Sequence, residues 1–262
     1  MDLKLKDKVV LITGSTGGIG TALTHAFAAE GCKLAITSTR QAKLDKLVPT
    51  IDIAEDHLFT QVVDVRNEDE VKAMVDKTVE HYGRLDVLVN NAGFEGTILP
   101  LTMQTKENFM AVYDINVFGA IYAMKYAAQV LAAQGDGSIV VIASGASFQG
   151  SPGMTPYISS KHAIAGIAKS LALELATTGV NVNCVCPGPV DTEMMRDIES
   201  KALGDSVKTE DAVKQFAAGT PNGRYAKAEE VAALSVFLAS PLVRHITGDL
   251  VNIDGGVAAN GR

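Results

Sequence analysis

The chain of 262 residues has no tryptophan, only 5% aromatic residues, three cysteines and no excess of basic residues. Its 23 lysines and arginines are outnumbered by 30 aspartates and glutamates, so the formal net charge is −7. Binding to nucleic acid or to an anionic membrane requires a basic surface, and neither partner is expected here. No apolar run approaches the ~20 residues that cross a bilayer, so no membrane-spanning helix is expected either.

The cysteines Cys32, Cys184 and Cys186 follow neither a disulfide nor a zinc spacing. Cys184 and Cys186 alternate along an apolar, β-rich segment, which favours buried packing, and no metal site is predicted. Residues 1–8 carry charges and no apolar stretch, so no secretory signal is expected. These features favour a reducing, cytoplasmic environment.

The sequence does contain short apolar runs that alternate with amphipathic segments, and 47% of its residues are hydrophobic. This alternation predicts βαβ units and a parallel sheet. Without a linker or a composition break, we expect one α/β domain over 1–262. It would be a Rossmann-type, doubly wound parallel sheet of about seven strands in the order 3-2-1-4-5-6-7, with helices on both faces. Strands are predicted at 8–12, 33–37, 58–63, 85–89, 138–143, 180–186 and 250–253, and one long helix at 106–133.

A glycine-rich turn follows the first predicted strand with the spacing Gly14-x-x-x-Gly18-x-Gly20. Glycines let the backbone approach a diphosphate, and the next helix offers unpaired N–H groups at its N-terminus. The position of the turn therefore predicts a nucleotide site. Its expected members are Gly14, Ser15, Thr16, Gly18, Ile19 and Gly20.

Polar residues end the third and fourth predicted strands. Asp64, followed by Val65, could accept a hydrogen bond from an adenine amino group or could cap the next helix. Asn91, Ala92 and Gly93 could form a backbone wall for the adenosine half of a nucleotide or a plain turn.

Tyr157 and Lys161 are four residues apart in a predicted helix and would lie on the same face. A phenol has a pKa of ~10, and a neighbouring positive charge would bring it toward neutral pH, where acid–base catalysis works best. Ser144 ends a predicted strand and could hold a substrate oxygen against Tyr157. Asn116 is either an ordinary buried amide or one that interrupts helical bonding and holds a water near Lys161.

Together these motifs resemble the classical short-chain dehydrogenase/reductase family, and the resemblance extends from Thr13 to Gly256. The matching elements are Thr13-Gly14-x-x-x-Gly18-x-Gly20, Asp64-Val65, Asn90-Asn91-Ala92-Gly93, Asn116, Ser144, Tyr157-x-x-x-Lys161, Pro187-Gly188 with Thr192, and Asp254-Gly255-Gly256.

The resemblance implies an NAD(P)-dependent oxidoreductase that interconverts a secondary alcohol and its ketone. Tyr157 would transfer the proton, and Ser144 would hold the carbonyl. Lys161 would bind the nicotinamide ribose, and Asn116 would hold a water in a relay to it. The nicotinamide site would be formed by Pro187, Gly188, Val190 and Thr192, of which Val190 and Thr192 would orient the carboxamide.

The residues at the end of the second strand bear on the choice of cofactor. NAD-dependent members that resemble this chain usually have an aspartate where Ser38 stands. Ser38, Thr39 and Arg40 could instead accept a 2′-phosphate, which favours NADP(H). Arg40 lies one residue beyond the usual basic position and could also be a solvent-exposed helix start, so NAD(H) stays possible.

The substrate is expected to be a small molecule, namely a cyclic alcohol, a polyol or a sugar-like alcohol. A 3-oxoacyl-thioester reductase is an alternative, but the turns at 134–137 and 177–179 contain no basic residue to bind an acidic carrier protein. A regulatory nucleotide-binding protein without turnover is a second alternative, which the complete set of catalytic residues disfavours. The expected substrate residues are Phe94, Glu95, Gly145, Ala146, Gln149, Met154, Met194 and Met195.

The segment at about 191–222 is polar and longer than an ordinary connection. It is expected to contain two short helices and to form a lid over the substrate. The last helix and the last strand resemble family surfaces that pair subunits, which implies a homotetramer.

Overall fold

Seven parallel strands form one sheet in the order β3-β2-β1-β4-β5-β6-β7, which confirms the predicted topology. The computed structural model describes residues 1–204 and 207–259. The strands are β1 (Val9–Ile12), β2 (Lys33–Ser38), β3 (Leu58–Val62), β4 (Val87–Asn90), β5 (Gly137–Ile142), β6 (Val180–Pro187) and β7 (Leu250–Ile253). The α-helices are α1 (Gly18–Ala29), α2 (Gln41–Leu47), α3 (Glu68–Tyr82), α4 (Lys106–Tyr113), α5 (Ala120–Gln134), α6 (Thr155–Glu174), α7 (Glu193–Leu203), α8 (Thr209–Ala217) and α9 (Ala228–Ala239).

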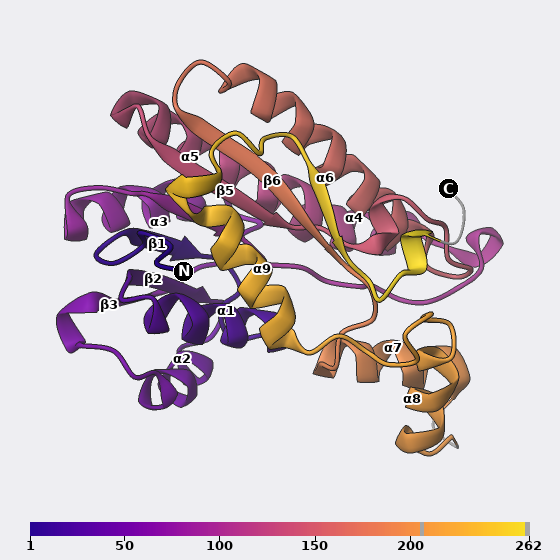
Figure 1. Ribbon diagram of the computed structural model, residues 1–262. Helices are drawn as coiled ribbons and strands as arrows, with labels where there is room; N and C mark the ends of the chain where they lie inside the picture. The colour runs from indigo at the N-terminus through magenta and orange to yellow at the C-terminus, as the bar shows by residue number, and fades with distance from the viewer. Residues whose placement is uncertain (205–206, 260–262) are drawn as a thin grey trace.

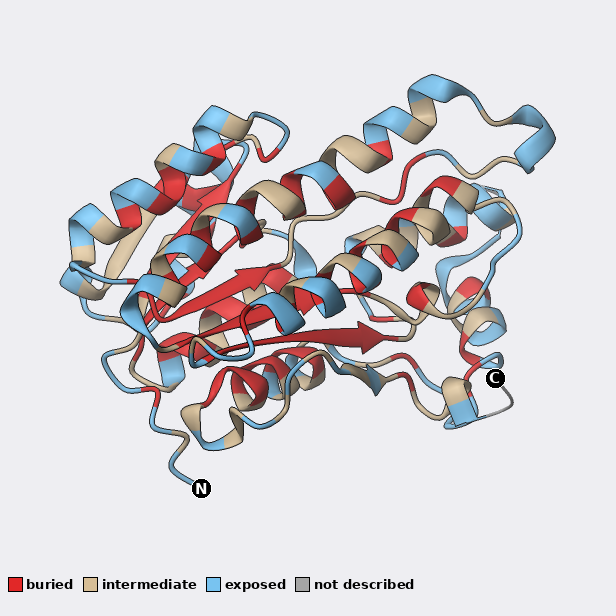
Figure 2. Cartoon of the chain, turned by 90° about the horizontal axis from the view of Figure 1, so that it is seen from above, coloured by how far each residue is buried: buried red, intermediate tan, exposed pale blue. Residues whose placement is uncertain are grey.

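The central strands consist of apolar runs because helices cover both faces of the sheet. Every residue of β1, β4, β5 and β6 is buried, as the red strands of Figure 2 show. In the middle of the sheet, Leu11 of β1 lies between Ala35 of β2 and Leu88 of β4. The outer strands β3 and β7 are partly exposed.

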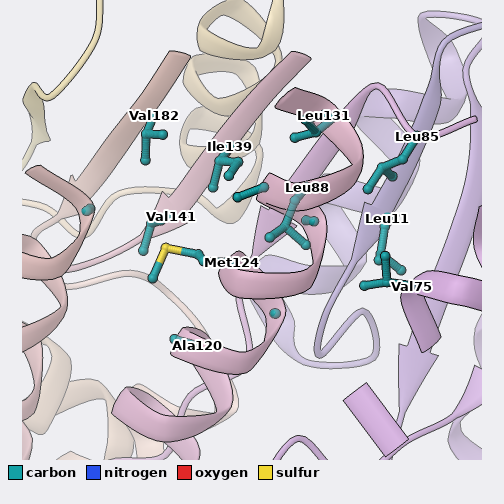
Figure 3. Close-up of a cluster of buried hydrophobic side chains, with 14 of the residues drawn as sticks. Leu11, Val75, Leu85, Leu88, Ala120, Met124, Leu131, Ile139, Val141 and Val182 are labelled. Carbon is teal, nitrogen blue, oxygen red and sulfur yellow. The ribbon is translucent and has the colours of Figure 1, made fainter. Parts of the chain in front are cut away.

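Two helical layers enclose the sheet (Figure 1). The helices α3, α5 and α6 pack on one face, and α1, α2 and α9 pack on the other. Figure 3 shows the first of these clusters, in which Met124 of α5 and Val75 of α3 lie among strand residues such as Leu88 and Ile139. Burying a side chain of this size contributes roughly 1.5–3 kcal/mol relative to exposure, so both layers fix the orientation of the strand ends.

The helix predicted at 106–133 is present, but it is not α-helical throughout. A π-helical segment, Asp114–Gly119, separates α4 from α5. The wider turn places Gly119 directly against Val65. The approach is so close that a Cβ at residue 119 would lie 2.8 Å from Val65 Cγ2. The segment contains Asn116, which agrees with the alternative that this residue interrupts helical bonding, and π-helical turns often occur at functional sites.

The segment predicted to be a lid contains two short helices, α7 and α8, as expected. Figure 1 shows both helices beyond the carboxyl end of the sheet. Residues 205–206 of this segment lie outside the described residues, as do residues 260–262 at the end of the predicted domain. Within the described part of the chain, no helix has the length and apolar character needed to cross a membrane.

Candidate active site

The glycine-rich turn connects β1 to α1 and lines a large cleft. Gly14 has a φ of 65°, and a Cβ there would lie 2.9 Å from Ala92 Cα, so the turn can approach β4 because it has no side chain. A Cβ at Gly18 would lie 2.6 Å from Thr192 Cγ2. Helix α1 has no side-chain cap and no acidic residue in its first turn, so its N-terminal N–H groups suit an anionic diphosphate.

Thr13 and Asn91 tie this turn to the end of β4. The Thr13 hydroxyl accepts hydrogen bonds from the backbone N–H groups of Asn91 at 2.9 Å and Ala92 at 3.1 Å. In return, the Asn91 amide donates to the carbonyls of Thr13 and Gly14, each at 3.0 Å. The predicted adenosine wall is therefore held rigidly against the glycine-rich turn.

Positive side chains gather where a nucleotide ribose would lie. Ser38 ends β2, and its hydroxyl is 2.9 Å from that of Thr16. Arg40 and Lys43 follow at the start of α2, where both are exposed and line the cleft. This end of the cleft therefore carries the charge that an additional phosphate requires.

Asp64 lies farther along the same cleft, after β3. Its carboxylate accepts hydrogen bonds from Arg66 Nε at 2.9 and 3.0 Å, and Arg66 holds the pKa of this carboxyl below its usual value. The alternative that Asp64 caps the next helix was wrong, because Asn67 is the N-cap of α3 and accepts from the N–H groups of Asp69 and Glu70. Contact between Asp64 and an adenine stays a prediction.

Tyr157 and Lys161 lie on α6 beside the carboxyl end of β5. The Lys161 ammonium is buried, donates a 2.9 Å hydrogen bond to the carbonyl of Ile142, and lies 5.7 Å from the centre of the Tyr157 ring. Ser144 follows β5 by two residues, and its hydroxyl accepts from the N–H of Ala146 at 3.1 Å. The strand and the helix thus bring the predicted triad together.

The expected lowering of the Tyr157 pKa is not found. Burial raises the pKa of the Tyr157 phenol, an effect that the Ser144 hydroxyl opposes and the charge of Glu95 reinforces. Burial also lowers the pKa of Lys161 to about 8. Desolvation disfavours the charged forms of both groups, so at neutral pH Tyr157 is a protonated phenol.

Asn116 lies in the π-helical segment, and its amide reaches across to the loop after β4. Its Oδ1 accepts from the N–H of Phe94 at 2.8 Å, while Nδ2 donates to the Phe94 carbonyl at 2.9 Å and to Ser160 Oγ at 3.0 Å. A Cβ at Gly93 would lie 3.7 Å from Asn116 Oδ1 and 3.8 Å from Lys161 Nζ. Asn116 and Lys161 therefore face the same point, although the predicted water relay stays a prediction.

Tyr157 lies where two cavities meet. The cleft of about 780 Å³ runs from Arg40 past the glycine-rich turn to Tyr157 and Lys161. A second cavity of about 360 Å³ extends from Tyr157 and Ser144 toward the lid. One cavity is long and lined by glycines and by charged side chains of both signs, and the other is compact and mainly apolar.

Most of the predicted site residues line one of these cavities. The cofactor residues in the cleft are Gly14, Thr16, Gly18, Ile19, Gly20, Ser38, Thr39, Arg40, Asp64, Val65, Asn91, Ala92, Gly93, Tyr157, Lys161 and Thr192, together with Phe94, Glu95 and Met194 from the substrate set. The compact cavity is lined by Ser144, Gly145, Ala146, Gln149, Met154, Met194, Met195, Pro187, Gly188 and Val190.

Ser15 lies outside both linings. Its buried hydroxyl donates to the carbonyl of Ile12 at 2.9 Å and accepts from the N–H of Thr37 at 3.1 Å. Its side chain is therefore used inside the turn that holds β1 to β2, which glycine spacing alone does not reveal.

Several lining residues were missed in the sequence. Lys43 and Arg66 lie in the cleft, and Lys43 could have been found because it follows Arg40 by three residues, one turn along the helix. Ile198 and Phe216 of the lid and Val257 near the C-terminus line the compact cavity. These three have no local sequence signal, because the lid and the C-terminal segment bring them to the site.

The sequence of the chain is similar to those of known oxidoreductases. The sequence profile of the family described as enoyl-(acyl carrier protein) reductase matches residues 14–258. The chain is 36% identical over 255 residues to the 3-oxoacyl-[acyl-carrier-protein] reductase FabG of Thermotoga maritima, covering 97% of this chain and 99% of the relative. It is 37% identical over 262 residues to (+)-borneol dehydrogenase 2 of Salvia officinalis, covering 98% and 91%.

Solved structures show the same likeness. The crystal structure of levodione reductase matches with a TM-score of 0.94 and 31% identity, covering 98% of this chain and 100% of the other. Two further neighbours carry cofactors, and both match with a TM-score of 0.89 at 31% identity, covering 97% of this chain and 100% of theirs. They are ElxO with NADP bound and a xylitol dehydrogenase with NAD⁺ bound.

Proposed function

We propose that this protein, which belongs to the short-chain dehydrogenase/reductase family, reduces a compact ketone to a secondary alcohol with NADPH. The observation that carries the proposal is the position of Tyr157 and its neighbours at the junction of two cavities. The long cleft fits a dinucleotide, because its glycines leave room for a diphosphate at the N-terminus of α1. The cofactor would supply the hydride.

The chain's own residues would orient the substrate and move the proton. Ser144 would donate a hydrogen bond to the substrate oxygen, a contact that strengthens as negative charge develops there. Tyr157 would give that oxygen its proton, since a phenol is protonated at neutral pH. Lys161 would bind the ribose hydroxyls, and Asn116 would hold the wall beside it through Phe94.

The preference for NADPH rests on Ser38, Arg40 and Lys43. An aspartate at residue 38 would repel a 2′-phosphate, whereas Ser38 is neutral and two cations follow it along the cleft. Guanidinium groups bind phosphate in a bidentate manner, and lysines bind it as point charges. NAD(H) is the alternative cofactor, supported by the neighbour with NAD⁺ bound.

The preference for a compact ketone rests on the second cavity, which is about 360 Å³ and mainly apolar. A carrier protein would in addition need cations at the turns before β5 and β6. The structure brings Lys8 and Arg244 to the first of these turns, but both pair with Asp136, at 3.4 and 3.0 Å. Lys8 pairs with Asp86 as well, at 3.0 Å, so both cations already have carboxylate partners.

A 3-oxoacyl-thioester reductase is the second candidate, because the Thermotoga maritima relative with that activity is 36% identical. Parallel assays with NADPH would separate the two. We expect a higher kcat/KM for compact cyclic ketones than for an acetoacetyl thioester. A clear preference for the thioester would favour the second candidate, and turnover of neither would contradict both.

We further propose that 191–222 is a substrate lid and that the protein forms a homotetramer. The lid helices contribute Met194, Met195 and Ile198 to the compact cavity. In the described part of the chain, β7 is an edge strand that pairs with β6 on one side, which leaves its other side open to a second copy. Light scattering that gives the mass of one chain would contradict the assembly.

A further inference from the structure

The loop after β4 forms a fixed wall of the cofactor cleft. Phe94 is bound through both backbone groups to the Asn116 amide. The N–H of Thr97 donates to Asn108 Oδ1 of α4 at 2.9 Å. Between these points Gly96 has a φ of 75°, and a Cβ there would lie 2.5 Å from Val112 Cγ2, so the loop packs tightly on α4.

Glu95 lies in this wall and is 6% exposed. Its Oε1 is 2.5 Å from Nζ of Lys201, near the C-terminal end of α7, and the same ammonium donates to the carbonyl of Gly96 at 3.3 Å. Lys201 itself keeps 37% of its side chain exposed. A carboxylate buried to this degree needs a positive partner, and here that partner comes from the lid.

The lid also has contacts of its own, which Lys201 extends to the wall. Met195, Ala217 and Tyr225 form a small buried cluster. The Tyr225 hydroxyl donates to Glu199 at 2.6 Å, and Arg196 pairs with Glu199 at 3.0 Å. These groups hold α7 to α8 and to Tyr225 just beyond the lid, whereas Lys201 holds α7 to the loop after β4.

We propose that the Glu95–Lys201 ion pair fastens the lid to the wall of the cleft, so that Lys201 is a positioning residue that limits how fast the cofactor leaves. The proposal rests on the proposed function in taking the cleft as the cofactor site. The fastening reaches the reaction centre in short steps. Glu95 follows Phe94, Phe94 is bound to Asn116, and Asn116 donates to Ser160, which precedes Lys161.

The test is the dissociation rate of NADPH, measured by stopped-flow displacement. We expect Lys201→Met to release NADPH about tenfold faster, since the pair is intermediate between an exposed ion pair and a buried one. Lys201→Arg, which keeps the charge, should stay within about threefold of the wild type. The matched control is Lys208→Met, because Lys208 is an exposed lid lysine at the N-cap of α8.

A double-mutant cycle separates this ion pair from a general effect of charge. Once Glu95→Gln has removed the pair, Lys201→Met should accelerate release no further. The proposal would be overturned if the two substitutions multiplied each other's effect on the release rate. It would also be overturned if Lys208→Met accelerated release as much as Lys201→Met. An unchanged release rate in Lys201→Met would overturn it as well.

Hydrogen exchange of α7 in the ligand-free protein provides a readout that does not depend on the cofactor. We expect the amides of 193–203 to exchange several-fold faster in Lys201→Met than in Lys208→Met. Equal exchange would overturn the fastening. If the wild type bound neither NADPH nor NADH, the proposed function would fail, and exchange alone would decide whether the ion pair holds the lid.

Discussion

The proposed catalytic residues and the proposed lid border the same cavity but are held in different ways. Ser144, Tyr157 and Lys161 are attached to β5 and α6, whose inner faces belong to the main core beside the sheet. The lid has a buried cluster of three residues and several ion pairs. From this difference we expect the framework to fix the chemistry, and the proposed lid to set which ligand enters and how long it stays.

The largest expected effect comes from the framework. Tyr157→Phe keeps the ring and removes the proton that the substrate oxygen receives. Turnover should fall by about 10³-fold, within the range for losing a general acid, while NADPH affinity stays within about threefold because the ring remains. Steady-state rates and fluorescence titration would measure both. Turnover close to that of the wild type would refute the role of Tyr157.

A second effect tests how strongly the framework buries Lys161. Its folded-state pKa of about 8 lies below the ordinary lysine value of 10.5, so folding favours the neutral amine. Below pH 8 Lys161 is charged in both the folded and the unfolded states. Burying that charge then lowers the free energy of unfolding by its full amount. As the pH rises from 8 to 10.5, the folded state loses its proton first, and wild-type stability improves relative to Lys161→Met.

The expected change in this stability difference between pH 7 and pH 10.5 is about 3 kcal/mol. Urea unfolding of the wild type and Lys161→Met at the two pH values would measure it. The lost hydrogen bond to Ile142 is common to both pH values and cancels. A difference that stays constant with pH would show that Lys161 is less desolvated than its burial indicates.

A third effect concerns the far end of the cleft. Arg40→Ala should weaken NADPH binding by about tenfold, as expected for one charge-assisted contact. NADH binding should stay within about twofold, because NADH lacks the 2′-phosphate. Parallel fluorescence titrations would measure both, with Lys46→Ala as a control, since Lys46 is an exposed lysine of the same helix. Tighter binding of NADH than of NADPH by the wild type would show that the cofactor preference is wrong.

The smallest effect is expected in the lid. Met194 lines both cavities and is partly exposed. Met194→Ala should raise KM for a compact ketone by about threefold and leave kcat within about twofold, since it removes contact area and no reacting group. A large fall in kcat with unchanged KM would mean that the lid takes part in the chemical step.

The framework and the lid also differ in how much of each could be predicted from the sequence. The order of the sheet and the positions of Ser144, Tyr157 and Lys161 follow from local patterns, namely apolar runs, glycine spacing and one helical turn. The Glu95–Lys201 pair joins residues 106 positions apart, and no local pattern connects them. The π-helical segment at Asn116 and the pairing of Asp64 with Arg66 depend on individual hydrogen bonds that periodicity does not encode.

The direction of the Tyr157 pKa shift also required the structure. Four-residue spacing places a positive charge near the phenol, but the balance between that charge and desolvation depends on how deeply α6 is buried against β5. Burial is the largest effect on the pKa of both groups.

The central claim is that hydride passes from the cofactor in the long cleft to a ketone in the compact cavity beside Tyr157. It is tested most directly with NADPH carrying deuterium at the transferred position of C4, a panel of compact cyclic ketones, and mass spectrometry of the products. The account predicts an alcohol that contains one deuterium, formed by the wild type and formed about 10³-fold more slowly by Tyr157→Phe. An unlabelled alcohol, or no alcohol from any ketone of the panel, would contradict it.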